Sequence, residues 1–327
     1  MAGFDNIFGN KENIKMFSSL VAQGKLSHAY MLYGARGSGK KTMALAIAEA
    51  LAKDASDEMR SRILTERCPD VSIIRRPDDK KTMGVSVVRD LISTVSLSPS
   101  DLDFKMYIID NADTMTTQAQ NALLKVIEEP PKNTYIILLC ENPSSMLQTV
   151  RSRVQAVGME CFKYDVLSEY LKKHEGTDVT AERFMFAAKM SEGAIGKTAE
   201  ILKNDEMYNM YLSVCEILRM QTRKFTEIRY FQFISYISDI CKSRDSIALM
   251  LDLLYMAYRD ILIFKYSDRA DAVFLTNEKA MELSERFACE SLELVQKSIS
   301  DIRAAIEFNV NTSITASMIA AELWNVV

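Results

Sequence analysis

The sequence predicts an α/β domain with a parallel sheet and a glycine-rich loop of the P-loop type, followed by two all-helical domains. Three observations lead to this fold class. Short apolar runs alternate with helical patterns in the first half of the chain. A glycine-rich segment follows the first of those runs, where a strand would turn into a helix. Beyond Cys161 no segment is typical of a strand, whereas helical periodicity continues.

Four segments are predicted strands because each is a short, nearly continuous apolar run rich in Ile, Val and Tyr. They are Ala29–Tyr33, Val71–Arg75, Lys105–Asp110 and Tyr135–Cys140. Apolar runs of this kind, separated by helices, indicate a parallel sheet that is covered on both faces.

Two helices of the first half follow from residue spacing. Met43–Leu51 carries apolar residues at helical intervals directly after the glycine-rich segment. The second helix lies between the last two strands, with apolar residues at i, i+3, i+4 and i+7: Ala119, Ala122, Leu123 and Val126. Thr114 or Thr116 is expected to cap its start, and Pro130 to end it.

The rest of the chain reads as helices. Asp178–Leu202 is expected to form short helices around a Glu-Gly-Ala-Ile-Gly segment, and Ser246–Phe264 is apolar on nearly every face, as in a buried bundle helix. A helix is expected over Ser291–Phe308, then a turn at 309–311 where Asn311 caps a last helix ending near Trp324. The predicted domains are 1–162, 163–206 and 207–327.

Composition narrows the class of protein. The 327 residues are 48% apolar and 26% charged, with a net charge of −4, which excludes a disordered chain, a collagen and a DNA-coating basic protein. The longest apolar runs are far shorter than the roughly 20 residues that span a bilayer. Residues 1–6 lack the basic start and apolar core of a signal peptide. We expect a cytoplasmic protein without membrane contact.

The residues that commonly bind metal are few and scattered. The two histidines are His28 and His174, and no two of the six cysteines form a CxxC pair. Neither a zinc site nor a disulfide framework is predicted, because both need closely placed ligands or partners.

The glycine-rich segment Gly34–Lys41 (GARGSGKK) nearly matches the P-loop pattern G-x-x-x-x-G-K-[ST]. Gly34, Gly37 and Gly39 would let backbone N–H groups converge on a phosphate, and Lys40 would add a full charge. The last position holds Lys41 instead of the hydroxyl that binds Mg²⁺, and Thr42 lies one residue late, about 100° around the helix. Phosphate binding survives this change better than hydrolysis does. The alternative to a phosphate-binding loop is a glycine-rich structural turn in which the lysine has no role.

A second acidic element ends the third predicted strand. Asp110 stands where a Walker B aspartate would assist Mg²⁺. The next position, which should carry a catalytic glutamate, holds Asn111, and an amide cannot act as a general base. Asp113 is a conceivable substitute, although it fits better as the start of the turn into the next helix.

Three further motifs give the chain a family resemblance. Leu26–Tyr30 (LSHAY), Asn121–Pro131 (NALLKVIEEPP) and Thr149–Gln155 (TVRSRVQ) resemble the AAA+ subunits of bacterial clamp loaders, and most closely the delta-prime group of DNA polymerase III. The resemblance implies an AAA+ α/β domain, a small helical lid and a helical collar that joins a pentameric ring. It implies as partners the gamma/tau and delta subunits and, through the complex, the sliding clamp and primed DNA.

The resemblance also implies a role for Arg153, which matches the arginine finger that such subunits lend to a neighbour's ATP site. Its function would be to stabilise charge on the γ-phosphate. Without the flanking motif, Arg151 and Arg153 would read as a solvated pair.

Three departures from the family pattern concern metal and nucleotide. The four-cysteine zinc module of many relatives is missing, since Cys68 stands alone after a stretch without cysteine. The lid arginine of hydrolysing relatives is matched by Gly196, beside Lys197. The γ-phosphate sensor region falls on Cys140–Pro143, where a Thr or Asn would serve, and the residue that takes the sensor position stays open.

Three functions remain open on the sequence. The first is a non-hydrolysing clamp-loader subunit that belongs to the polymerase complex without its own ATPase, and that binds ATP or ADP, if at all, without hydrolysis. The second is an active ATPase of the gamma/tau type. The third is an unrelated P-loop enzyme such as a small-molecule kinase. Lys41, Asn111 and Gly196 favour the first over the second, and the clamp-loader motifs disfavour the third.

Overall fold

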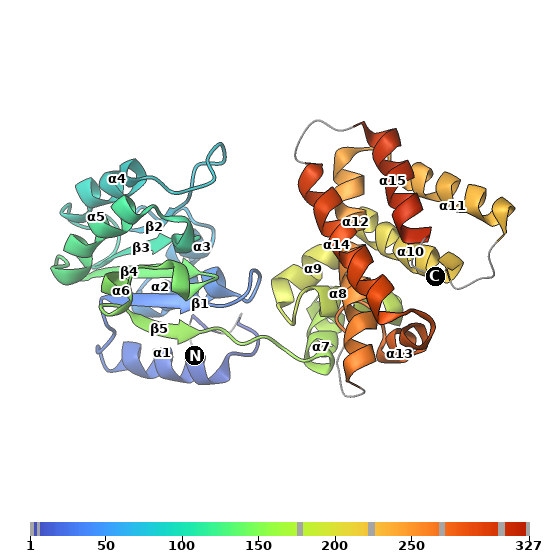
Figure 1. Ribbon diagram of the computed structural model, residues 1–327. Coiled ribbons are helices and arrows are strands. Elements are labelled where there is room, and N and C mark those ends of the chain that lie inside the picture. Colours follow the sequence, from blue (N-terminus) through green and yellow to red (C-terminus); the bar gives the residue numbers. More distant parts are fainter. Residues whose placement is uncertain are drawn as a thin grey trace. The chain divides into compact units, whose positions relative to one another are not determined.

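The computed structural model describes residues 3–4, 7–174, 179–221, 226–267, 272–306 and 311–324 (Figure 1). The chain forms two compact units. Unit 1 contains Met1–Gly176 and Glu192–Thr198, and unit 2 contains Thr177–Ser191 and Ala199–Val327. The division into three domains that the sequence suggests stays a prediction.

Unit 1 is built on a five-stranded parallel sheet with the order β2-β3-β4-β1-β5. The strands are β1 (Ala29–Tyr33), β2 (Val71–Ile74), β3 (Lys105–Ile109), β4 (Thr134–Cys140) and β5 (Gln155–Gly158). The parallel α/β fold and the four predicted strands are confirmed. The edge strand β5 was not predicted.

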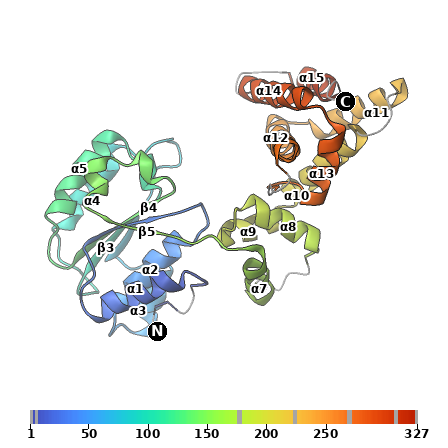
Figure 2. The ribbon, with the colours of Figure 1, turned by 60° about the horizontal axis from the view of Figure 1, so that its bottom comes forward.

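Helices cover both faces of this sheet, as Figure 2 shows. One face packs against α1 (Lys11–Ala22), α2 (Lys40–Leu51) and α3 (Asp57–Leu64). The other packs against α4 (Val85–Val95), α5 (Thr117–Glu128) and α6 (Gln148–Arg151). Alternate residues of β1 serve the two cores: Tyr30 and Leu32 face the first, Ala29 and Met31 the second. Because side chains alternate along a strand, one apolar run supplies two cores.

The predicted helix between β3 and β4 is α5, and its cap is Thr116. The Thr116 hydroxyl accepts a hydrogen bond from Ala119 N at 3.2 Å. Thr114 ends a short 3₁₀ helix, η1 (Ala112–Thr114), and its hydroxyl donates to Asn111 O. Unit 1 also holds α7 (Tyr164–His174) and the start of α9 (Ile195–Leu202).

The described part of unit 2 is helical. Its helices are α8 (Ala181–Met190), the end of α9, α10 (Asp205–Gln221), α11 (Glu227–Ile240), α12 (Arg244–Tyr266), α13 (Asn277–Arg286), α14 (Cys289–Ala305) and α15 (Thr312–Trp324). The predicted buried helix is α12, which buries ten side chains. Asn311 caps α15 as predicted, because its Oδ1 accepts from Ser313 N at 3.0 Å. Asp178, Phe308 and residues 309–310 lie outside the described residues.

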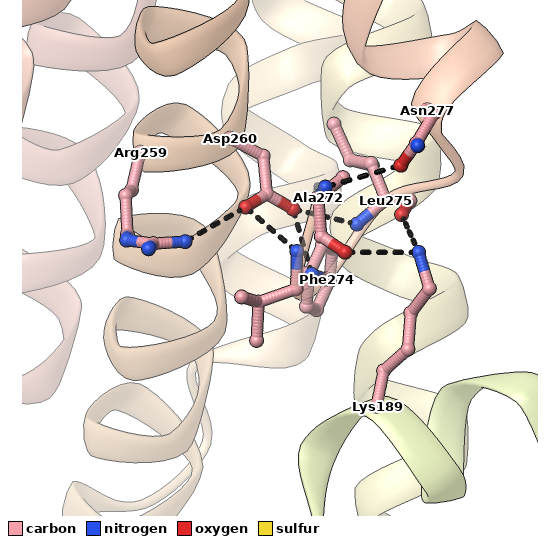
Figure 3. Close-up of polar contacts among 8 residues, drawn as sticks. Lys189, Arg259, Asp260, Ala272, Phe274, Leu275 and Asn277 are labelled. Atoms are coloured by element: carbon pink, nitrogen blue, oxygen red, sulfur yellow. Dashed lines mark hydrogen bonds and ion pairs between the residues drawn. The ribbon is translucent and has the colours of Figure 1, made fainter. Parts of the chain in front are cut away.

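A buried carboxylate organises the segment that joins α12 to α13 (Figure 3). Asp260 is fully buried and accepts hydrogen bonds from the backbone N–H groups of residues 273, 274 and 275, at 2.9, 2.6 and 2.9 Å. Lys189, on α8, donates to the carbonyl oxygens of Ala272 and Leu275 at 3.0 and 2.6 Å. Two charged side chains thus bond five polar backbone groups of residues 272–275.

No helix in the described ranges is long and apolar enough to cross a bilayer.

Candidate functional site

The glycine-rich loop joins β1 to α2 along a backbone path that favours glycine. Gly37 and Gly39 have φ values of 82° and 89°, in the left-handed region that residues with a Cβ rarely adopt. Gly39 is the N-cap of α2 and Lys40 is its first residue. The loop therefore ends at a helix amino terminus, where N–H groups without helical partners carry partial positive charge.

Lys40 is turned back onto its own loop. Its ammonium donates to the carbonyl oxygens of Gly34 and Ala35 at 2.7 and 2.9 Å. Burial lowers the pKa of Lys40, while the nearby carboxylates of Glu141, Asp113 and Asp110 act to raise it. The cation that would meet a phosphate is thus already bonded to carbonyls and surrounded by negative charge.

Lys41 has a partner outside the loop. Its ammonium forms an ion pair with Glu66 at 2.9 Å, and Arg75 bonds the second oxygen of the same carboxylate. The hydrogen bond from Arg75, and then that from Lys41, lowers the pKa of Glu66. The position that should bear a magnesium-binding hydroxyl therefore holds a paired cation.

The end of β3 lies beside the loop, as the sequence predicts. The Asp110 carboxylate accepts a hydrogen bond from Asn111 N at 3.1 Å, and Asn111 has φ 52°. Asp113 lies within η1, as the turn assignment expects. Its Oδ2 accepts from the backbone N–H groups of Glu141 and Asn142, both at 3.3 Å. Asp113 thus joins the ends of β3 and β4.

Two neighbouring residues of the predicted sensor region, Glu141 and Asn142, have different surroundings. Asn142 Oδ1 accepts a hydrogen bond from Ser144 N at 3.0 Å and so caps the short helix η2 (Pro143–Ser145). Glu141 instead lines the cavity above the loop. Of these two residues, Glu141 is therefore the one that places a carboxylate in the lining of the cavity.

This cavity measures about 840 Å³, within the range of roughly 300–1,000 Å³ that is typical of small-molecule sites. Its lining includes the cations Arg36, Lys40 and Arg76 and the carboxylates Asp110, Asp113 and Glu141. Aromatic rings line it as well, and the ring centroid of Phe8 lies 4.5 Å from that of Tyr170 and 5.8 Å from that of Phe162.

The start of α9 closes against the loop. Gly196 N donates to Gly37 O at 3.0 Å. A Cβ on Gly37 would lie 2.4 Å from Lys197 N, and one on Gly196 would lie 3.2 Å from Gly37 O. A large side chain at position 196 would have to displace the loop, so this backbone contact depends on the two glycines.

Arg153 lies at the amino end of the strands, whereas the glycine-rich loop lies at their carboxyl end. The loop follows the carboxyl end of β1, whereas Arg153 precedes the amino end of β5, whose Gln155 pairs with Tyr30 of β1. The five residues of β1 are separated by four steps, which place the two ends of the strand roughly 13 Å apart. The structure brings the loop, Asp110 and Asn111 together and places Arg153 apart from them.

The segment that carries Arg153 is held by α5. Glu128, the last residue of α5, forms an ion pair with Arg153 Nε at 2.6 Å. Gln120 is 3% exposed; its Oε1 accepts from Leu147 N at 2.7 Å and its Nε2 donates to Met115 O at 3.1 Å. Neither role is among those predicted from the sequence. Glu128 lies within the NALLKVIEEPP motif, whereas nothing near Gln120 in the chain signals its burial.

Replacing Gln120 by methionine should lower the free energy of unfolding by about 2 kcal/mol, because the partly buried Leu147 N–H loses its acceptor. Urea unfolding of the full chain, followed by circular dichroism, measures the change. Gln118→Met, at an exposed position of the same helix, is the control and should change it by less than about 0.5 kcal/mol. Equal midpoints for the two variants would contradict the assigned role.

Comparisons with known proteins agree with the family resemblance. A family model described as "DNA polymerase III, delta subunit" matches residues 9–163. The delta' subunit of DNA polymerase III from Bacillus subtilis (strain 168) is 25% identical over 309 residues, which cover 90% of this chain and 88% of the relative. The tau subunit of the same organism is 23% identical, and the match covers 92% of this chain but 58% of that longer relative. A crystal structure of a gamma subunit-related protein from Thermotoga maritima is 18% identical, with a TM-score of 0.47, 95% of this chain covered and 99% of that one.

Proposed function

Because the chain belongs to the clamp-loader family of DNA polymerase III subunits, we propose that it is a delta-prime-type, non-hydrolysing subunit that lends Arg153 to a neighbour's ATP site. The observation that carries the proposal is the placement of Arg153. It lies at the amino edge of the sheet, across β1 from the loop of its own chain. A side chain in that place is suited to a phosphate on another subunit.

The residues of the loop support the absence of hydrolysis. Lys41 is paired with Glu66 where a magnesium-binding hydroxyl is needed, and Asn111 replaces the general base. Glu141 faces the cavity with negative charge, and Gly196 leaves no lid arginine. Each change removes a different part of the chemistry, so no single substitution restores it.

The donor set around the cavity does not fit a magnesium–nucleotide complex. Mg²⁺ prefers near-octahedral oxygen ligands, and here a cation occupies the position of the loop hydroxyl. ATP or ADP without metal would have to draw Lys40 away from the carbonyls of Gly34 and Ala35. The catalytic step therefore belongs to the neighbour's site, and this chain supplies the guanidinium.

The proposed partners are the gamma/tau and delta subunits in a heteropentameric ring, with the sliding clamp and primed DNA reached through that complex. In this arrangement residues 1–162 form the AAA+ domain, 163–206 the lid and 207–327 the collar. The delta' relative supports the assignment, because the match extends over 88% of its length.

The isolated chain should hydrolyse no ATP above background, with or without primed DNA, because metal ligation and water activation are both missing. Phosphate release from the purified chain measures this. The matched positive control is the complex reconstituted with its catalytic subunits. Robust turnover by the chain alone would contradict the proposal and favour an active subunit of the gamma/tau type.

A further inference from the structure

Two of the family motifs, NALLKVIEEPP and TVRSRVQ, meet near the amino ends of the strands, at the end of α5. Glu128 Oε1 accepts from Arg153 Nε at 2.6 Å. Arg153 Nη1 donates to Thr149 O at 3.0 Å and lies 3.3 Å from Ser152 Oγ. Within the described part of the chain, Nη2 is the nitrogen of this guanidinium without an acceptor. The carboxylate and the carbonyl thus fix the plane of the guanidinium and leave one nitrogen for an incoming anion.

Both ends of this ion pair rest on anchored backbone. His28 Nε2 lies 2.8 Å from Ile127 O, and therefore ties the last turn of α5 to the start of β1. On the other side, Val150 and Val154 are buried and flank Arg153. The side chains of Glu128 and Arg153 are 46% and 42% exposed, so the pair is itself accessible. The anchored backbone on both sides therefore sets the geometry of this ion pair.

We propose that Glu128 is the positioning residue of the arginine finger, holding the Arg153 guanidinium with Nη2 directed to a neighbour's phosphate. The inference rests on the proposed function of Arg153 and deepens it. A free arginine side chain has many rotamers, and fixing it beforehand reduces the entropy lost when it meets its target. Glu128 touches neither substrate nor metal in this role, and it acts only through Arg153.

The test uses the reconstituted complex with full-length subunits. Glu128→Gln keeps the size of the side chain and removes its charge, and Glu129→Gln makes the same change one residue along as the control. Glu128→Gln should lower the kcat of DNA-stimulated ATP hydrolysis about two- to fivefold, the scale of an exposed ion pair, with KM for ATP unchanged. Glu129→Gln should leave both parameters unchanged. In an Arg153→Ala background, Glu128→Gln should have no further effect.

The outcomes separate this inference from the function on which it rests. If Arg153→Ala leaves the complex unchanged, the proposed function fails and the positioning role fails with it. If Arg153→Ala lowers kcat but Glu128→Gln does not, only the positioning role is overturned. A rise in kcat for Glu128→Gln would show that Glu128 withholds the finger, and an equal loss with and without Arg153 would show an unrelated role. Either result overturns the inference.

Discussion

Replacing Arg153 by alanine should slow ATP hydrolysis at the adjacent site of the reconstituted complex by about 10³-fold, the lower end for fingers supplied in trans. Steady-state hydrolysis by the whole complex should fall less, because sites that do not depend on this subunit continue to turn over. The side chain is 42% exposed, so the variant should fold and assemble normally. Single-turnover hydrolysis and clamp loading at saturating ATP measure the two effects.

Arg151→Ala is the matched control, because Arg151 lies two residues away and ends α6. It should change hydrolysis and loading little. Arg153→Lys keeps the charge and loses the planar fork that binds phosphate through two nitrogens, so it should recover only a small part of the rate. Equal rates for Arg153→Ala and the unmodified subunit would rule out the finger and leave a purely structural subunit.

Replacing Asp260 by alanine should lower the free energy of unfolding of unit 2 by about 3–5 kcal/mol, as expected when a buried charged group that bonds several donors is removed. Backbone N–H groups of residues 273–275 would lose their acceptor inside the protein. The single tryptophan, Trp324, lies in unit 2 against Phe233. Its fluorescence therefore reports the unfolding of this unit in the full chain.

Arg259→Ala is the control for this variant. Arg259 lies 3.2 Å from Asp260 and its side chain is 43% exposed, so its loss should cost less than about 1 kcal/mol. The three backbone hydrogen bonds to Asp260 remain in this control. An Asp260→Ala variant that unfolds at the same denaturant concentration as Arg259→Ala would contradict the organising role of the carboxylate.

The sheet could largely be predicted from the sequence, because strands buried on both faces leave nearly continuous apolar runs. The predicted strand Val71–Arg75 differs from β2 by one residue, and Ala29–Tyr33 coincides with β1. The edge strand β5 escaped prediction for the same physical reason. Its four residues, Gln155–Gly158, are exposed or half-buried, so the segment carries no apolar run.

The candidate site was predictable only where its parts adjoin in the chain. Local patterns of glycine, lysine and aspartate predict the loop and the end of β3. The pairing of Lys41 with Glu66 and of Arg153 with Glu128 joins residues that only the fold brings together. The contact between Gly37 and Gly196 joins residues that are still farther apart in the sequence. The sequence also left the sensor residue undecided within Cys140–Pro143.

The discontinuity of unit 1 has a consequence for synthesis on the ribosome. Glu192–Thr198 completes unit 1, yet residues 177–191 belong to unit 2. At a synthesis rate of about 5–20 residues per second, the segment that packs on Gly37 is made roughly 1–4 s after residue 176. Helix α8 acquires its native contacts later still, because the carbonyl groups that Lys189 binds belong to residues 272 and 275. Those residues are made about 4–17 s after it. During that interval Phe186 of α8 lacks its native ring contact with Phe274, and nascent chains stalled there should bind a holdase chaperone.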